Sequence, residues 1–227
     1  MPVQTSHVRQ RIGQLKNDLT RLFEDDTKRG TLQLVLNRLD KTAGEIETEE
    51  QKIKDNPHLT PQGRQAQLRD LSTKKGKELQ QFLSDELTKA TDSHRTLSDL
   101  LFTNEGRRQL DIAYNRESAP IEEDRTLRYL REQEIRMGWR DKPQAERDRE
   151  YIRALHAGDH ETARALSNAP GGPLVTADTK RRVDTAYAEQ RFPAAYENFS
   201  QVSVLREQLQ GLSDLSGRWL DGLGTQA

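Results

Sequence analysis

Apolar residues recur in steps of three and four through the N-terminal part of the chain, and polar residues fill the positions between them. The recurring residues are Val8, Ile12, Leu15, Leu19 and Leu22, then Leu32, Leu36, Leu39, Ala43, Ile46 and Ile53. This spacing lines one face of a helix, as in a coiled coil. The phase of the pattern breaks between Glu24 and Gly30. The pattern therefore predicts either one helix from Val3 to Asp55 with a stutter at the break, or two helices that meet there.

A short segment with two prolines, Asn-Pro-His-Leu-Thr-Pro at residues 56–61, follows this striped region. Pro57 disfavours helix at the residue before it, and Thr60 followed by Pro61 is typical of a helix N-terminus. A second stripe begins beyond the turn and consists of Leu68, Leu71, Leu79, Phe82, Leu83, Leu87 and Ala90. Because so short a turn brings two striped helices side by side, the segment predicts an antiparallel helical hairpin.

Shorter helical stretches follow, each with its own start or stop signal. The expected starts are Asp92 or Ser93, Pro120, Pro143, Asp159, Thr176 and Pro193, and the expected C-terminal caps are Gly138 and Gly158. No stretch alternates β-branched and polar residues as a strand would. The predicted fold class is therefore all-α: a long N-terminal antiparallel, coiled-coil-like hairpin followed by a compact bundle of shorter helices. We expect three regions, namely the hairpin (1–92), a helical middle region (93–169) and C-terminal helices (170–227) after a Pro/Gly linker.

Composition narrows the kinds of protein that such helices can build. Lys and Arg number 36 against 37 Asp and Glu, and the charged and hydrophobic fractions are both 32%. So little apolar material argues against a wide α/β enzyme core, whereas the balance of charge argues against disorder and against a basic nucleic-acid module. The chain has no cysteine, which excludes disulfides, thiolate zinc sites and cysteine nucleophiles. Its apolar runs are too short for a membrane span or a signal peptide, so we expect neither.

Candidate catalytic and metal-binding residues are few. His156 and His160 are spaced four residues apart, as two metal ligands on one helix would be. The Gly158-Asp159 pair between them indicates a break in the helix, which favours histidines in a surface turn. The sequence also lacks a phosphate-binding glycine loop and a serine nucleophile elbow. We therefore predict a non-enzymatic protein without cofactor or metal, and keep as a lesser hypothesis an enzyme with a site around His156, Asp159, His160 and Glu161.

Basic side chains offer a candidate contact with phosphate. Arg125, Arg128 and Arg131 recur at every third position, so they share much of one helix face. Two further basic clusters are Arg107-Arg108 and Lys180-Arg181-Arg182. Acidic residues are interleaved with the arginine stripe, and this mixture favours an ordinary solvated helix surface. Contact with nucleic acid is therefore not the favoured interpretation, and the alternative function is a nucleic-acid-associated dimeric coiled-coil regulator.

Two phrases in the sequence carry a resemblance to a known class of protein. Residues 56–64, Asn-Pro-His-Leu-Thr-Pro-Gln-Gly-Arg, lie between the two striped helices, and residues 155–166 contain the pair Gly158-Asp159 between short helical stretches. The first phrase resembles a pattern that divides a helical hairpin in structural-region proteins of tailed phages. The second resembles the small turns, with Gly-Asp between two helices, that are common in such proteins. The resemblance implies a role in the virion or in its assembly, without catalytic residues.

The leading functional hypothesis from the sequence is a structural or assembly protein that acts through helix–helix contacts. It predicts a homo-oligomer or contacts with other virion proteins, in the virion or the host cytoplasm, and no contact with a membrane. The residues expected to form the interface are Leu15, Leu19, Leu36, Leu39, Ile46, Ile53, Leu68, Leu71, Leu79 and Phe82. Burying these side chains against a partner would supply about 25 cal/mol per Å² of apolar area.

Overall fold

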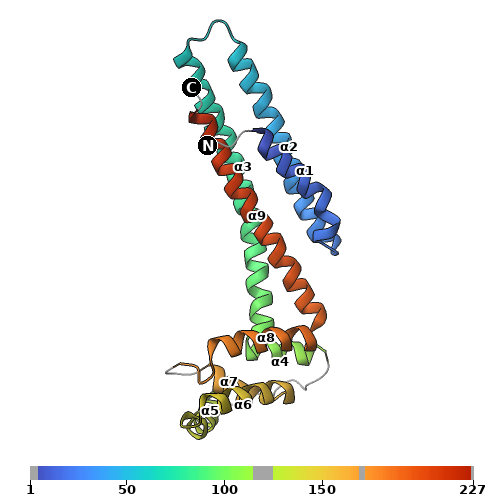
Figure 1. The fold of residues 1–227 in the computed structure, drawn as a ribbon, viewed down its shortest axis with the longest axis vertical. Helices are drawn as coiled ribbons and strands as arrows, with labels where there is room; N and C mark the ends of the chain where they lie inside the picture. The colour runs from blue at the N-terminus through green and yellow to red at the C-terminus, as the bar shows by residue number, and fades with distance from the viewer. Residues whose placement is uncertain (1–4, 115–124, 169–171, 226–227) are drawn as a thin grey trace. The chain divides into compact units, whose positions relative to one another are not determined.

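The computed structural model describes residues 5–114, 125–168 and 172–225, and all the regular structure in these ranges is helical (Figure 1). The helices are α1 (Thr5–Leu22), α2 (Asp26–Asp55), α3 (Pro61–Phe102), α4 (Asn104–Ala113), α5 (Arg125–Arg140), α6 (Gln144–Ala157), α7 (His160–Ser167), α8 (Ala177–Arg191) and α9 (Pro193–Thr225). The predicted all-α class with a long helical hairpin is confirmed. None of the helices in these ranges combines the length and the apolar character that crossing a bilayer requires.

The chain forms two compact units. Unit 1 contains residues 1–94 and 200–227, and unit 2 contains residues 95–199. Helices α3 and α9 therefore each contribute residues to both units. Residues 200–227, which the sequence grouped into a C-terminal region, belong instead with the N-terminal helices, because Leu205, Leu209 and Leu212 of α9 are buried in the same core as the stripes of α1 to α3.

Unit 1 is a four-helix bundle in which each helix runs antiparallel to its neighbours. Side-chain contacts show that α1 lies beside α2, α2 beside α3, α3 beside α9, and α9 beside α1. The contacts are Arg9–Glu47 and Lys16–Asp40, then Lys75–Glu45 and Arg38–Phe82, then Ser72–Leu220, and finally Trp219–Thr5 and Arg11–Gln208. The apolar stripes of the four helices meet inside the bundle, and Leu32, Leu36, Leu39 and Ile46 of α2 lie fully buried there. An apolar stripe one face wide is sufficient to fill such a core.

Local capping chemistry explains where the helices of unit 1 begin and end. The first striped region is two helices, separated at residues 23–25, and the Asp25 carboxylate accepts a hydrogen bond from the Lys28 amide at 2.9 Å as the N-cap of α2. Gly30 lies inside α2. The predicted start at Asp92 or Ser93 is wrong, because α3 continues through both residues to Phe102. Its stripe stays in phase there, so capping-type residues on the exposed face do not end the helix.

Unit 2 is a cluster of shorter helices around a second core. Its core combines apolar residues from α3, α6, α7 and α8, and the buried members are Leu101, Tyr151, Ala154, Leu155, Ala163, Leu166, Val175, Tyr187, Ala188 and Phe192. Gly158 ends α6 with a φ of 72°, and the Asp159 carboxylate accepts from the Thr162 amide at the start of α7, both as predicted. Gly138 is not a cap, because α5 continues to Arg140. The start predicted at Pro120 lies outside the described residues.

The junction of α3 and α4 depends on the absence of a side chain at Gly106. A Cβ atom at this position would lie 2.2 Å from the Asp99 carbonyl oxygen and 2.4 Å from the Leu100 Cα. Both are backbone atoms of α3, which cannot move aside as a flexible side chain would. The close approach follows from the sharp turn at Thr103, whose hydroxyl accepts from the Gly106 amide at 3.0 Å as the N-cap of α4.

We predict that Gly106→Ala lowers the free energy of unfolding by about 1–3 kcal/mol, since the added methyl group forces α4 away from α3. Chemical denaturation followed by circular dichroism measures the change. Gly138→Ala is the matched control, because the space around Gly138 is open and alanine favours helix. Its stability should be unchanged or slightly higher. Equal stability of the two variants would contradict the packing described at Gly106.

Candidate functional site

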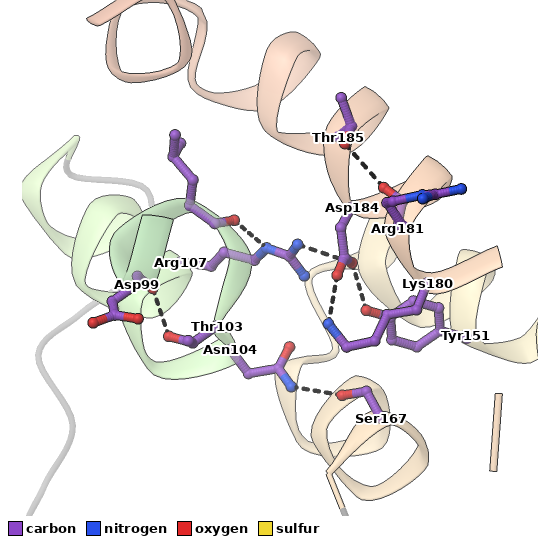
Figure 2. A network of polar contacts seen from close by, with 11 residues as sticks. Asp99, Thr103, Asn104, Arg107, Tyr151, Ser167, Lys180, Arg181, Asp184 and Thr185 are labelled. Atoms are coloured by element: carbon purple, nitrogen blue, oxygen red, sulfur yellow. Dashed lines mark hydrogen bonds and ion pairs between the residues drawn. The ribbon is translucent and has the colours of Figure 1, made fainter. Parts of the chain in front are cut away.

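A group of buried polar side chains lies in unit 2, where α4, α6 and α8 meet (Figure 2). Asp184 of α8 is at its centre. One oxygen of its carboxylate accepts from the Tyr151 hydroxyl at 2.5 Å and lies 2.9 Å from Arg107 Nη2, and the other accepts from Lys180 Nζ at 2.6 Å. The Arg107 side chain is 0% exposed, and its Nε donates to the Leu101 carbonyl at 2.8 Å.

The surroundings of Tyr151 keep its hydroxyl protonated. Burial, with a further contribution from the Asp184 carboxylate, raises the pKa of the Tyr151 hydroxyl well above its ordinary value. Tyr151 therefore stays a hydrogen-bond donor at neutral pH and does not become a base or nucleophile. The Arg107 guanidinium also lies 5.2 Å from the centre of the Tyr187 ring, which covers it with aromatic surface.

A second buried carboxylate, Asp111 of α4, joins three helices of unit 2. Its Oδ2 lies 3.2 Å from His160 Nε2 at the start of α7, and its Oδ1 accepts from Arg191 Nε of α8 at 3.1 Å. Asn104 lies on the same face of α4, about two turns before Asp111, and donates from Nδ2 to the Ser167 hydroxyl at 3.2 Å. The buried face of α4 is thus polar along its length, with Asn104, Arg107 and Asp111 spaced at i, i+3 and i+7.

These polar groups can hold helices together, and their geometry does not resemble a catalytic centre. Arg107 meets Asp184 of α8, and Asp111 meets His160 of α7 and Arg191 of α8. Arg107, Tyr151 and Asp184 are closed off from solvent. His156 and His160 lie on different helices, because α6 ends at Ala157 and α7 begins at His160. In the ranges that the structure describes, no three His, Cys, Asp or Glu side chains are placed to share a metal ion.

Sequence reasoning missed this polar group. Arg107 and Lys180 stood out only as members of basic clusters with a potential for phosphate contact, and each instead pairs with Asp184. A polar stripe at positions 104, 107 and 111 is visible in the sequence, but it is indistinguishable from a solvated helix face. Which face of α4 is buried depends on the helices that pack against it.

A shallow groove follows the line between α2 and α3 in unit 1. Two adjoining hollows of about 600 Å³ each form it, and their linings share Glu45 and Lys75, which are joined by an ion pair of 2.5 Å. The remaining lining residues are Leu34, Asn37, Arg38, Lys41, Thr42, Gly44, Thr48, Glu49, Leu71, Lys74, Glu78, Leu79 and Phe82. Both signs of charge alternate along the groove, so it offers no single-sign site for an ionic ligand.

Helix α5 leaves several large apolar side chains exposed. Leu127, Leu130 and Met137 are 53%, 52% and 66% exposed, whereas Arg136 is the one buried side chain among residues 126–140. Trp139 packs against the apolar core of unit 2, and polar groups add further contacts. Arg136 donates from Nη1 to the Ala165 carbonyl at 3.0 Å, and Glu132 accepts from Arg164 Nε at 2.6 Å. Exposed large apolar residues gathered on one face typically mark a site of contact with another molecule.

The residues predicted from sequence as a partner interface lie within unit 1 instead of on its surface. Leu15, Leu19, Leu36, Leu39, Ile46, Leu68 and Leu79 are buried, and Ile53, Leu71 and Phe82 are partly buried. Helices of the same chain cover them, which removes the apolar area that the sequence assigned to a partner. The sequence could not distinguish the two cases, because a stripe has the same spacing whether it meets its own chain or another.

The three candidate phosphate contacts are on α5. Arg131 is exposed, Arg128 is partly buried, and the side chain of Arg125 lies outside the described residues. Arg131 and Arg128 therefore differ in their access to solvent, although they are one helical turn apart. Contact of this stripe with nucleic acid stays a prediction.

The phrase at residues 56–64, which carries the phage resemblance, is a self-contained turn between α2 and α3. Asn56 Oδ1 accepts from the His58 amide at 2.9 Å, and the Thr60 hydroxyl accepts from the Gly63 amide at 3.1 Å. Arg64 Nη2 donates back to the Asn56 carbonyl at 3.1 Å, which closes the turn. The polar members of the phrase thus satisfy the backbone groups of two helix ends.

We predict that Arg107→Ala lowers the free energy of unfolding of unit 2 by about 3–5 kcal/mol, since it leaves a buried carboxylate short of a partner and opens a void. Arg181→Ala is the matched control. Its guanidinium pairs with Asp178 but is 82% exposed, so its loss should leave stability almost unchanged. Urea denaturation of the full chain with a probe in unit 2 measures both. Similar stabilities of the two variants would contradict a structural role for the buried pair.

We also predict a pH-dependent contribution from Asp148 of α6, which accepts hydrogen bonds from Gln144 and from Thr176 and Thr179 at the start of α8. Burial opposes ionisation, but these bonds outweigh it and hold the pKa of the carboxyl below its ordinary 3.8. As the pH falls, the Asp148 carboxyl is therefore protonated in the unfolded chain before it is protonated in the folded protein. The stabilisation is complete above the ordinary pKa and is lost as pH falls through the folded-state value.

Denaturation of the wild type and of Asp148→Asn between about pH 6 and pH 3 tests this sign. The difference in stability between the two proteins should shrink as pH falls. A constant difference would show that the carboxylate charge is not what ties α6 to α8.

Comparisons with protein-family models, curated proteins and solved structures found no match to this chain. Its function is therefore inferred from its own residues and their geometry.

Proposed function

We propose that the protein is a non-enzymatic structural or assembly protein that acts through helix–helix contacts. The observation that carries the proposal is the outward-facing apolar side of α5. A helix face that carries Leu127, Leu130 and Met137 is costly to leave in water, and it is suited to a partner that covers the apolar side.

The electrostatics of the buried polar groups support a structural function over a catalytic one. Arg107, Asp184 and Asp111 are paired across helices, and the raised pKa of Tyr151 keeps its hydroxyl protonated. General acid–base catalysis needs a group with a pKa near the working pH and within reach of a substrate. Tyr151 meets neither requirement, because its pKa is raised and its side chain is closed off from solvent.

The kind of assembly that we propose is a tailed-phage particle, in which the chain is a head, neck, scaffold or internal protein. This part of the proposal rests on the resemblance of residues 56–64. The support for a phage particle is the position of this segment, which lies between two long helices and forms the turn that joins them. The proposal places the protein in the virion or the host cytoplasm.

We predict that replacing Leu130 and Met137 together by serine weakens partner binding by about tenfold or more, because each buried aliphatic side chain supplies about 1.5–3 kcal/mol. Both residues are exposed, so the variant should keep its helical content and thermal midpoint. Native mass spectrometry and hydrogen exchange at α5, on the tagged full chain alone and with co-purified components, give the measurement. A species above the monomer mass, with protected α5 amides, should be present in the wild type and lost in the variant.

Leu34→Ser is the control, because Leu34 is 57% exposed but lies in unit 1 beside the α2–α3 groove. It should leave assembly unchanged. If Leu34→Ser abolishes assembly and the α5 variant does not, the interface is at that groove and not on α5. A wild-type monomer that retains no partner and shows the same α5 exchange as the variant would overturn the proposed function.

A further inference from the structure

The exposed stripe of α5 has a charge pattern of its own. Positions 127, 130, 134 and 137 repeat one face of the helix, and they carry Leu, Leu, Glu and Met. Glu134 and the neighbouring Arg131 are both exposed. A positive and a negative charge thus lie near the middle of the stripe, with apolar side chains towards each end.

This order of residues is self-complementary when the helix direction is reversed. In the antiparallel register that sets Leu127 against Met137 of a second copy, Leu130 meets the aliphatic part of Glu134. Arg131, one residue further on, then lies within side-chain reach of the same carboxylate. A two-fold axis repeats every contact, so two apolar layers lie at the ends of the interface and two opposite-charge pairs lie inside them.

The backbone at the end of the stripe is also open to close approach. Gly138 follows Met137 on the exposed side of α5, and no atom lies within 4 Å of the position that its Cβ would occupy. The absence of a side chain there leaves room for the Leu127 end of a second helix. The opposite side of α5 is anchored to unit 2 through Arg136 and Glu132, which fixes the orientation of the stripe.

We infer that α5 binds α5 of a second copy of this chain, antiparallel and about a two-fold axis. The inference rests on the proposed function and names the partner of its α5 face. An anionic membrane surface fits the stripe less well, since Glu134 in its middle would be repelled by the headgroups and would be costly to insert. The reversed-register pairing of Arg131 with Glu134 is what favours a second copy over an unrelated helix.

Charge reversal tests this pairing. Arg131→Glu alone and Glu134→Arg alone each place like charges together twice, and each should weaken self-association by roughly tenfold or more. The double variant carrying both changes should restore it. An equimolar mixture of the two single variants should form a mixed dimer, because each then offers the charge that the other needs.

Sedimentation equilibrium gives the association constants, and native mass spectrometry with one variant isotopically labelled identifies the mixed dimer. Arg149→Glu, an exposed charge reversal on α6, is the control and should associate as the wild type does. Circular dichroism checks that every variant stays folded. Single variants that associate like the wild type, or a mixture and a double variant that both fail to recover, would overturn the inference.

The outcomes separate this inference from the proposed function. If replacing Leu130 and Met137 abolishes assembly while charge reversal shows no complementation, the α5 face binds a different partner and only the second-copy inference falls. If neither experiment changes the mass of the native species or the exchange of α5, both fall together.

Discussion

The structure depends on burying narrow apolar stripes against one another. In unit 1 each helix supplies one stripe, and four helices arranged antiparallel are enough to enclose them. Such a bundle needs little apolar material, which is why a chain with equal charged and hydrophobic fractions can still form a core. The remaining faces carry charges of both signs, and pairs such as Arg9–Glu47 and Lys75–Glu45 join neighbouring helices at the rim of that core.

Unit 2 has shorter helices, and it combines an apolar core with a group of buried polar side chains. Its helices are too short for long stripes, and α4 enters the unit with Asn104, Arg107 and Asp111 on its buried face. Burying charge is costly, and the cost is offset only when each group meets a partner of good geometry. Arg107 meets Asp184 of α8, and Asp111 meets His160 of α7 and Arg191 of α8, so these contacts tie α4 to its neighbours in the unit.

One apolar side of α5 is exposed on unit 2. This helix is tied to α7 by Glu132 and Arg136, and it leaves Leu127, Leu130 and Met137 to solvent. Unit 2 has an apolar core of its own, so the exposed apolar face of α5 is not needed to complete that core. The assembly function that we propose follows from this exposed face.

The sequence by itself determined the helices and most of their ends. Stripe spacing, Thr60-Pro61, Gly158-Asp159 and Thr176 act through contacts within a few residues, so they are legible without knowledge of the fold. Only the tertiary structure decided what the stripes meet. The leucines of α1 to α3 pack within their own chain, Arg107 is buried against Asp184, and α5 turns its leucines outward. The physical reason is that helical spacing specifies a face but not the surface that covers it.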